Sequence, residues 1–308
     1  MRDEVRPFFE AYGDAFTQGP RAIARFYAEP CITARGGMVR VNAGAAYRNA
    51  PASERYLVRS APAYFGDYYR FQIDRQIYPA LTLLGAGIAG DTERLAYHSL
   101  AGLTGDPEEA DAFTRAQHAG SMGPAVMLAR SFDLAGARRL LDVGGGSGAF
   151  SIALCQRNPE LRTTVLDFPN VIDVARRFVA EAGLEQRIDF VRADAVDGPW
   201  PAGQDIVLMS YLLSAMAEPA IPLLMRKAWD ALRPGGRLLI HDFMLDDDRA
   251  GPGPAALWFL QYLAGRIDGI SFSAADLARP LRSHGYEEIS DQVVIPEITR
   301  LVVCVRPS

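Results

Sequence analysis

The chain has 308 residues, 49% of them hydrophobic and 22% charged, and a formal net charge of −5 at pH 7. This composition is ordinary for a folded globular protein, and the acidic balance argues against binding of nucleic acid or an anionic membrane. Apolar runs stay well below the roughly 18 residues of a membrane-spanning helix, and the N-terminus lacks the apolar core of a signal peptide, so we expect a cytoplasmic protein. The cysteines, Cys31, Cys155 and Cys304, are too scattered to indicate a disulfide framework or a cysteine metal site.

Residues 1–45 differ in pattern from the remainder of the chain and are expected to form a separate N-terminal helical segment. Their helical periodicity is broken at Pro30 and again at Gly36-Gly37. The run FFEAYGDAFTQGPRAIARFYAEPCITARGG resembles the opening of a nuclear transport factor 2-like α+β domain. The rest of such a domain is missing, so the resemblance carries little information about function.

Residues 46–120 are predicted to be mostly helical and rich in aromatic side chains. Asp106 followed by Pro107 and two glutamates is typical of a helix start, because the aspartate caps free N–H groups and proline fits the first turn. This helix is expected to run through His118. We expect the region to cover a substrate pocket or to serve in dimerisation; the alternative is a helical cap with a buried aromatic core.

From residue 121 onward, apolar strands alternate with helices, which predicts an α/β fold with a doubly wound parallel sheet and helices on both faces. Strands are expected at 139–143, 163–166, 188–191, 205–209, 237–241, 293–295 and 301–305. Helices are expected at 149–157, 170–182, 219–232 and 274–284. The last two strands are close enough in sequence to form a hairpin.

A glycine-rich turn comes after the first of these strands and is the strongest motif in the chain. Asp142 ends the strand, and Gly144, Gly146 and Gly148 stand at alternate positions before a helix begins. Such turns also occur in nicotinamide and flavin enzymes, but the tighter spacing suits a ligand without a pyrophosphate, such as S-adenosylmethionine. The alternative is a glycine loop that only turns the chain.

Acidic residues stand at the ends of the next two strands, where ligands of open α/β sheets bind. Asp167 can accept hydrogen bonds from both hydroxyls of a ribose, and Phe168 beside it can stack on adenine. Asp194, followed by Ala195, stands where the exocyclic amine of adenine can donate. Each acid alone can be a loop or cap residue, but together they suit a cationic sulfonium ligand better than a phosphate.

The segments LLDVGGGSGAF, VLDFPNV, RADAV and ALRPGGRLLI together resemble the small-molecule methyltransferases of the plant and bacterial O-methyltransferase family. The resemblance runs from about Tyr47 to the C-terminus. It implies a Rossmann-like, seven-stranded class I methyltransferase sheet, with the S-adenosylmethionine-binding domain over residues 121–308. It also implies cofactor contacts to the methionine moiety, the ribose and the adenine by Asp142, Gly144, Gly146, Gly148, Asp167, Phe168, Asp194, Ala195 and Ser210.

Two departures from the family pattern bear on assembly and chemistry. The family usually has an N-terminal winged-helix dimerisation domain, whereas this chain has about 45 dissimilar residues before the matching region, so a homodimer is possible but open. After the fourth strand the phenol O-methyltransferases carry His-Asp-Trp, whereas this chain reads Tyr211 to Met216, YLLSAM. Their general-base histidine would fall near Gly265, where this chain has none.

Without that base, His241 and Asp242 become the catalytic candidates. This pair resembles the His-Asp of bacterial α-keto-acid C-methyltransferases, where it contributes to a bound divalent or ferric metal ion that stabilises an enolate. Neighbours on a strand face opposite ways, so the chain must turn for both to bind one ion. His284 or His118 would supply a third ligand; the alternative is a metal-free His241 that acts as a base or is merely hydrogen-bonded.

The covering helix and two aromatic residues are expected to contact the acceptor. Arg115 can clamp a carboxylate, although an exposed helix arginine is the alternative, and Tyr211 and Trp258 can be pocket walls or core. The expected substrate contacts are Arg115, Gln117, His118, Met122, Tyr211 and Trp258.

The sequence therefore predicts an S-adenosylmethionine-dependent methyltransferase of a small molecule, with C-methylation of an α-keto acid in bacterial secondary metabolism ahead of the alternatives. One alternative is O-methylation of a hydroxylated aromatic or polyketide. Another is a non-catalytic protein that only binds S-adenosylmethionine.

Overall fold

The computed structural model describes residues 39–41, 47–91, 100–134, 136–265 and 269–308. The chain divides into two compact units, residues 1–66 and 67–308. In the first unit, strands β1 (Val39–Val41) and β2 (Tyr47–Asn49) pair antiparallel, and helix α4 (Pro51–Tyr56) comes next. The segment that resembles a nuclear transport factor 2-like domain, residues 8–37, lies outside the described residues.

The second unit begins with helices, as predicted for this part of the chain. A π-helix, η1 (Tyr68–Ile77), leads into α5 (Tyr78–Leu81) and α6 (Leu84–Ala89), and α7 (Leu100–Gly105) precedes the long α8 (Pro107–Ser131). The Asp106 carboxylate accepts hydrogen bonds from the N–H groups of Glu108 (2.9 Å) and Glu109 (3.0 Å). The predicted helix start is therefore confirmed, and α8 continues well beyond His118.

Seven strands form one sheet in the order β5-β4-β3-β6-β7-β9-β8, and all pairs except those of β9 are parallel. The predicted seven-stranded sheet and its terminal hairpin are confirmed. The strands are β3 (Arg139–Val143), β4 (Arg162–Asp167), β5 (Ile188–Arg192), β6 (Gln204–Ser210), β7 (Leu232–Phe243), β8 (Glu287–Ile295) and β9 (Thr299–Val305). The largest differences from prediction are the earlier starts of β7 and β8, whose first residues are largely exposed and lack the expected apolar pattern.

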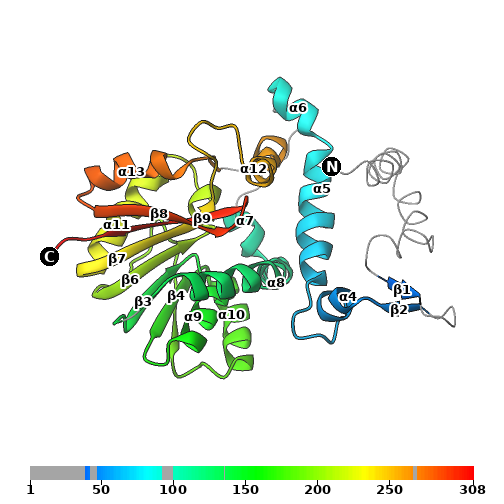
Figure 1. The fold of residues 1–308 in the computed structure, drawn as a ribbon, viewed down its shortest axis with the longest axis horizontal. Coiled ribbons are helices and arrows are strands. Elements are labelled where there is room, and N and C mark those ends of the chain that lie inside the picture. The colour runs from blue at the N-terminus through cyan, green and yellow to red at the C-terminus, as the bar shows by residue number, and fades with distance from the viewer. Residues whose placement is uncertain (1–38, 42–46, 92–99, 135, 266–268) are drawn as a thin grey trace. The chain divides into compact units, whose positions relative to one another are not determined.

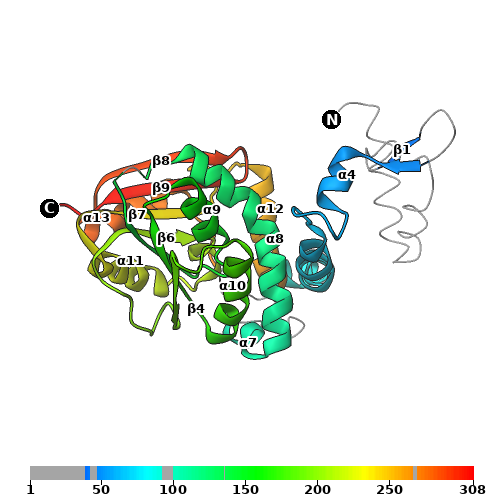
Figure 2. The ribbon, with the colours of Figure 1, turned by 90° about the horizontal axis from the view of Figure 1, so that it is seen from below.

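Helices cover both faces of this sheet (Figures 1 and 2). One apolar core joins the sheet to α8, α9 (Ala149–Arg157) and α10 (Pro169–Glu181), and the other joins it to α11 (Ala220–Ala231) and α13 (Ala274–Ser283). Helix α12 (Gly253–Gly265) packs against α5 and α6. Among the described residues, no helix combines the length and apolarity needed to cross a bilayer.

The carboxyl ends of the parallel strands meet at one edge of the sheet, and this edge places the candidate site. The register pairs Val143 of β3 with Leu166 of β4, and Ser210 of β6 with His241 of β7. The glycine turn, both later acids and the His241-Asp242 pair are thereby brought to the same edge.

Removing the cap of α8 should destabilise the second unit. Asp106→Ala leaves two N–H groups without their acceptor, so we expect a loss of about 1 kcal/mol in the free energy of unfolding. Asp106→Ser restores a capping oxygen and serves as the control. Thermal or urea unfolding measures both, and equal stability of Asp106→Ala and the parent protein would contradict the role of this cap.

Candidate active site

The glycine turn after β3 has a backbone conformation and close contacts that disfavour residues with a side chain. Gly144, Gly146 and Gly148 have φ angles of 64°, 56° and 77°, in the left-handed region that favours glycine. A Cβ atom at Gly144 would come within 2.8 Å of Leu212, and one at Gly145 within 2.8 Å of the Asp142 carboxyl carbon. The alternate glycines predicted from the sequence therefore form a bare backbone turn, which is how a Rossmann-like fold approaches a nucleoside ligand.

Asp142 lies fully buried directly beneath this turn. Its Oδ2 accepts a hydrogen bond from the Ser151 hydroxyl at 2.8 Å, whereas its Oδ1 has no hydrogen-bond partner among the described residues. Burial, and to a smaller extent the nearby Asp167, raise the pKa of this carboxyl to about 6. A buried carboxylate oxygen without a partner is costly and favours an adjacent donor or cation.

Asp167 joins β4 to the glycine turn. Its Oδ2 accepts the N–H of Gly146 at 2.8 Å, and its Oδ1 accepts the N–H of the half-buried Phe168 at 2.7 Å. Burial raises its pKa to about 6, and the Asp194 charge adds to the increase. Each oxygen retains a lone pair that can accept a ribose hydroxyl.

Asp194 lies in the loop after β5, close enough to Asp167 to affect its pKa. Its Oδ1 accepts the N–H of Val196 at 2.6 Å, and Lys227 of α11 donates to the carbonyls of Val196 and Gly198 at 2.7 and 2.6 Å. Ala195 accepts the indole N–H of Trp200 with its carbonyl at 2.9 Å. The three predicted acids are thus neighbours, and sequence reasoning missed Lys227 because its contacts are 29 and 31 residues away.

His241 is enclosed by hydroxyl groups of the neighbouring strands. The imidazole is fully buried, with Nδ1 2.9 Å from the Ser210 hydroxyl and Nε2 3.0 Å from the Thr299 hydroxyl. Burial lowers its pKa to about 3, so the ring is neutral at pH 7. Both ring nitrogens therefore have hydroxyl partners, which agrees with the metal-free, hydrogen-bonded alternative for His241, and the cofactor contact expected of Ser210 stays a prediction.

Asp242 points away from His241, as alternation along a strand requires. Its Oδ2 accepts the N–H of Ser214 at 3.0 Å and its Oδ1 that of Phe243 at 2.9 Å. It is fully buried, and this burial raises its pKa to about 7. A shared metal ion at His241 and Asp242 is thus not supported, because the chain does not turn between them.

The two expected third ligands are elsewhere. His284 Nδ1 lies 2.8 Å from the Pro280 carbonyl at the end of α13, and His118 contacts Ser147. The described residues contain no group of three or more His, Cys, Asp and Glu side chains that can hold a metal ion. The position near Gly265 where the family's histidine was expected adjoins residues 266–268, which are outside the described residues.

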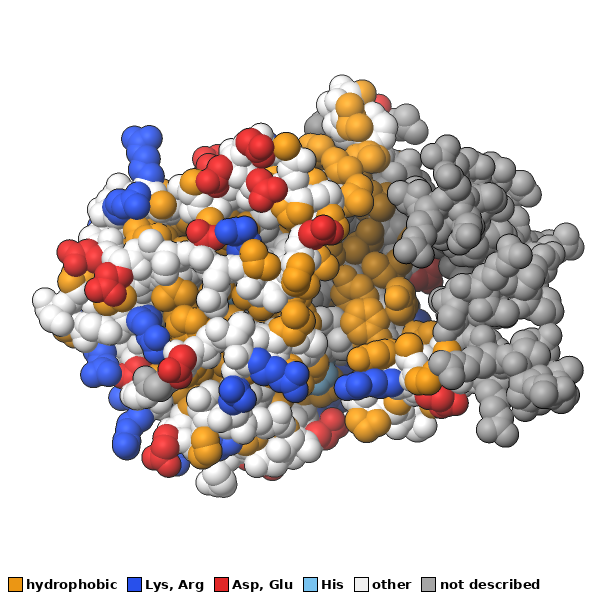
Figure 3. Space-filling model, viewed as in Figure 1, with side chains coloured by type: hydrophobic (Ala, Val, Ile, Leu, Met, Phe, Trp, Pro, Cys, Tyr) orange, Lys and Arg blue, Asp and Glu red, His pale blue; other side chains and the backbone are white. Residues whose placement is uncertain are grey.

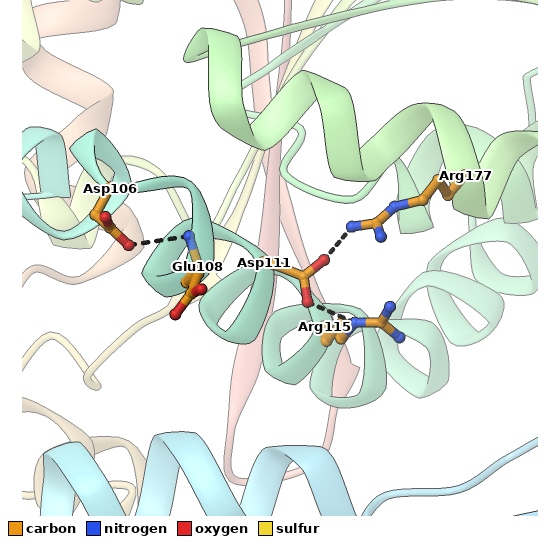
Figure 4. A network of polar contacts seen from close by, with 5 residues as sticks. All are labelled: Asp106, Glu108, Asp111, Arg115 and Arg177. Carbon is orange, nitrogen blue, oxygen red and sulfur yellow. Dashed lines mark hydrogen bonds and ion pairs between the residues drawn. The ribbon is translucent and has the colours of Figure 1, made fainter.

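The polar side chains predicted on α8 have different partners, and Arg115 points to Asp111 of its own helix (Figure 4). Arg115, 46% exposed, donates to Asp111 at 2.8 Å, and Asp111 also pairs with Arg177 of α10. The carboxylate clamp predicted for Arg115 is therefore replaced by the alternative, an exposed helix arginine. Gln117 donates to Gln72 of η1 at 2.6 Å, and Met122 is half-buried.

Aromatic rings lie around the end of β7, where the Tyr211 ring centroid is 4.9 Å from that of His241 and the Asp242 charge contributes to the raised pKa of Tyr211, after burial. Tyr211, with a left-handed φ of 55°, packs with its ring centroid 5.0 Å from that of Phe243, and Phe243 stacks on Trp258 at 4.4 Å. The Trp258 indole N–H donates to the Tyr262 hydroxyl at 3.3 Å, and burial together with the Asp242 charge raises the Tyr262 pKa to about 12. We call Tyr211, Phe243, Trp258 and Tyr262 the aromatic cluster.

The sequence identified Tyr211 and Trp258 but missed the other two members. Tyr262 was detectable, because it stands four residues after Trp258 and therefore on the same helix face. Phe243 comes directly after Asp242 and carried no signal of its own.

Comparison with known proteins identifies the family to which this arrangement belongs. Residues 90–287 match the O-methyltransferase domain family. The chain belongs to this family. A 3-hydroxy-5-methyl-1-naphthoate 3-O-methyltransferase of Streptomyces sahachiroi is 35% identical over 251 residues, covering 79% of this chain and 70% of the relative.

Two other proteins extend the comparison. An L-tyrosine C(3)-methyltransferase of Streptomyces lavendulae is 34% identical over 160 residues, covering 52% of this chain and 44% of the relative. The solved structure of human N-acetylserotonin methyltransferase with S-adenosylmethionine has a TM-score of 0.78 at 21% identity, covering 94% of this chain and 87% of that one. The last similarity concerns the fold alone.

As a member of this family, the chain is an S-adenosylmethionine-dependent methyltransferase with a class I α/β fold. The residues fit such a cofactor, because a glycine-rich turn stands beside a buried carboxylate oxygen without a partner among the described residues and beside two more acids. On the face shown in Figure 3, acidic and basic side chains are interspersed over the described residues.

Cofactor affinity should depend on pH through these acids. The Asp167 pKa of about 6 lies above its ordinary value, so the carboxylate is largely protonated at pH 5 and ionised at pH 7. We expect affinity for S-adenosylmethionine to rise between pH 5 and 7, and to rise less for S-adenosylhomocysteine, which lacks the sulfonium charge. Asp167→Asn should weaken binding about tenfold and reduce this rise.

Isothermal titration calorimetry at several pH values measures both effects. Asp189→Asn, an exposed change on the neighbouring strand, is the control and should bind as the parent does. Affinity that is unchanged by Asp167→Asn would mean that the ribose is bound elsewhere.

Proposed function

We propose that the chain transfers a methyl group from S-adenosylmethionine to a hydroxyl group of an aromatic or polyketide small molecule. The observation that carries this proposal is Asp242, a buried carboxyl with a pKa of about 7 near Tyr211 and Tyr262 of the aromatic cluster. The proposal is supported by the family, and by the relative whose name specifies 3-O-methylation of a hydroxynaphthoate.

The keto-acid prediction is weaker because its structural requirements are absent from the described arrangement. An α-keto acid would be held by a metal ion at His241 and Asp242 and by a cation at Arg115. His241 bonds to two hydroxyls, Asp242 faces the other way, and Arg115 pairs with Asp111. A hydroxylated aromatic acceptor needs neither feature, since flat rings pack against aromatic side chains.

In the proposed mechanism, Asp167 and Asp194 hold the adenosine and the glycine turn faces the methionine end. S-adenosylmethionine supplies a methyl group that moves to the acceptor oxygen as its bond to sulfur breaks and sulfur keeps the electron pair. Asp242 accepts the proton of the acceptor hydroxyl, which makes the oxygen nucleophilic. A phenol has a pKa near 10, and a base with a pKa close to the working pH suits this transfer.

A second candidate is methylation of a ring carbon next to such a hydroxyl. It is favoured by the relative named for C(3)-methylation of L-tyrosine, and by the absence of His-Asp-Trp at Tyr211 to Met216. The same Asp242 would serve, because an ionised phenol also activates its neighbouring carbon. Homodimerisation, the domain boundaries and the cytoplasmic location stay predictions.

The role of Asp242 predicts a specific kinetic defect. Asp242→Asn removes the proton acceptor, so we expect kcat to fall at least about a hundredfold while the Kd for S-adenosylmethionine stays the same. In the parent enzyme kcat/KM should rise with pH and level off above about pH 7, because the carboxyl must ionise to act. The variant should lose this inflection.

Steady-state kinetics with hydroxynaphthoates test this expectation, and the exposed Asp247→Asn, in the loop after β7, is the matched control. Full turnover by Asp242→Asn would exclude this carboxylate as the base.

The type of product and the need for metal can be tested together. With an isotopically labelled methyl donor, the carbon chemical shift of the product separates an O-methyl from a C-methyl group. We expect an O-methyl product, formed at the same rate when a chelator is present. A C-methyl product would replace the main proposal by the second candidate, and loss of activity in chelator would restore a metal-dependent mechanism.

A further inference from the structure

His118 of α8 contacts the glycine turn rather than an acceptor pocket. Its Nδ1 lies 2.9 Å from the Ser147 hydroxyl, and its ring stacks on Phe178 of α10 with centroids 3.7 Å apart and planes 8° apart. Burial lowers the His118 pKa to about 4, so the ring is neutral at pH 7. The contact is therefore a hydrogen bond between neutral groups, held in place by a stacked ring.

Ser147 stands at the centre of the turn. It is 2% exposed and lies between Gly146 and Gly148, the glycines with left-handed backbone. The turn is thus held from two sides, by Asp167 through the Gly146 N–H and by His118 through Ser147. The interaction with His118 comes from helix α8, which is not part of the sheet.

Gln117, the residue before His118, contacts η1 and not the glycine turn. Gln117 donates to Gln72 of η1 at 2.6 Å, and the two side chains are part-buried. Tyr68 of η1 packs against Gly120 of α8 so closely that a Cβ at Gly120 would come within 2.7 Å of its ring. Helix α8 is consequently fixed to η1 and to the glycine turn by adjacent residues.

Tyr68 also lies near enough to Tyr211 of the aromatic cluster to contribute to the raised pKa of that phenol, after burial and the Asp242 charge. Helix α8 is also braced against α10 by the pair of Asp111 and Arg177 (Figure 4) and by the stack of the His118 ring on Phe178. A shift of the turn relative to α8 would therefore be transmitted to η1 instead of being absorbed by movement of α8 alone.

We propose that His118 is a positioning residue that holds the cofactor turn through Ser147 and couples cofactor binding to η1. The proposal rests on the placement of S-adenosylmethionine at the glycine turn, and it holds for either acceptor atom. By reciprocity, whatever orders η1 also strengthens cofactor binding. His118 then acts on the cofactor side of the reaction rather than as the acceptor contact expected from its position on the covering helix.

Two substitutions separate the hydrogen bond from the ring stack. His118→Phe keeps an aromatic ring on Phe178 and loses the bond to Ser147, whereas His118→Asn places an amide near the position of Nδ1 and loses the stack. Calorimetry with S-adenosylhomocysteine should show binding weakened about tenfold in His118→Phe and about equally in Ser147→Ala. The double variant should be no weaker than either single one, and His118→Asn should recover most of the affinity.

Hydrogen exchange then measures the coupling. S-adenosylhomocysteine should slow amide exchange in η1 of the parent protein and of His118→Asn, but not in His118→Phe at equal saturation. Unchanged affinity of His118→Phe, additive effects of the two single variants, or η1 protection that survives in His118→Phe would each overturn the proposal.

Asp167→Asn, measured alongside, separates the role of His118 from the placement of the cofactor. If Asp167→Asn weakens binding while His118→Phe does not, the inference about His118 fails, whereas the placement of the cofactor at the glycine turn is supported. If neither variant changes affinity, the cofactor is not at the glycine turn and both conclusions fail.

Discussion

The hydrogen bonds between the glycine turn and β4 are the constraint on which the candidate site depends. The Gly144 N–H donates to the Leu166 carbonyl at 2.8 Å, and the Gly146 N–H donates to the Asp167 carboxylate at 2.8 Å. These bonds require left-handed backbone at both glycines, which costs other residues about 1–2 kcal/mol each. The parallel pairing of β3 with β4 supplies the acceptors, so the sheet itself determines the shape of the turn.

The buried carboxylates beside this turn lower the free energy of unfolding of the ligand-free protein at neutral pH. Burial raises the pKa values of Asp142 and Asp167 to about 6, above their ordinary values, so both carboxyls bind protons more tightly when the chain is folded. Their contribution to the free energy of unfolding therefore decreases as pH rises from about 4 to 6. A cationic ligand beside these carboxylates offsets the cost of burying their charge at neutral pH, and its binding therefore stabilises the folded state.

The sheet was predictable from the sequence because its information is local. Hydrophobic runs of strand length, helices between them, and acids at strand ends are each visible in short windows. The salt bridge of Arg115 with Asp111 was visible as well, since a spacing of four residues places both on one helix face. That spacing favours the second of the two roles left open for Arg115, an exposed helix arginine.

The parts of the site that sequence reasoning missed depend on distant partners. His241 bonds to Thr299, 58 residues away, and Gln117 to Gln72, 45 residues away. Nothing near His241 in the sequence distinguishes an imidazole held by two hydroxyls from one that is free to bind a metal ion. Adjacent histidine and aspartate on a strand did carry one reliable signal, namely that their side chains face opposite sides.

That alternation assigns different roles to the two sides of β7. On the His241 side, hydroxyls from β6 and β9 close around a neutral imidazole, which joins three strands and has no nitrogen left for chemistry. The rings of Tyr211 and Phe243 also pack on this side, with the Tyr211 centroid 4.9 Å from that of His241. On the Asp242 side, a carboxylate is bonded to two backbone N–H groups and lies near enough to Tyr211 and Tyr262 to raise the pKa of each phenol. The pKa of about 7 at Asp242 arises from burial. The absence of water that favours binding of an aromatic acceptor therefore also makes this carboxylate basic enough to accept the proton of the acceptor hydroxyl. Water entering the site would lower that pKa and weaken the base, and efficient proton transfer from the acceptor therefore requires the residues that bury Asp242 to keep water out.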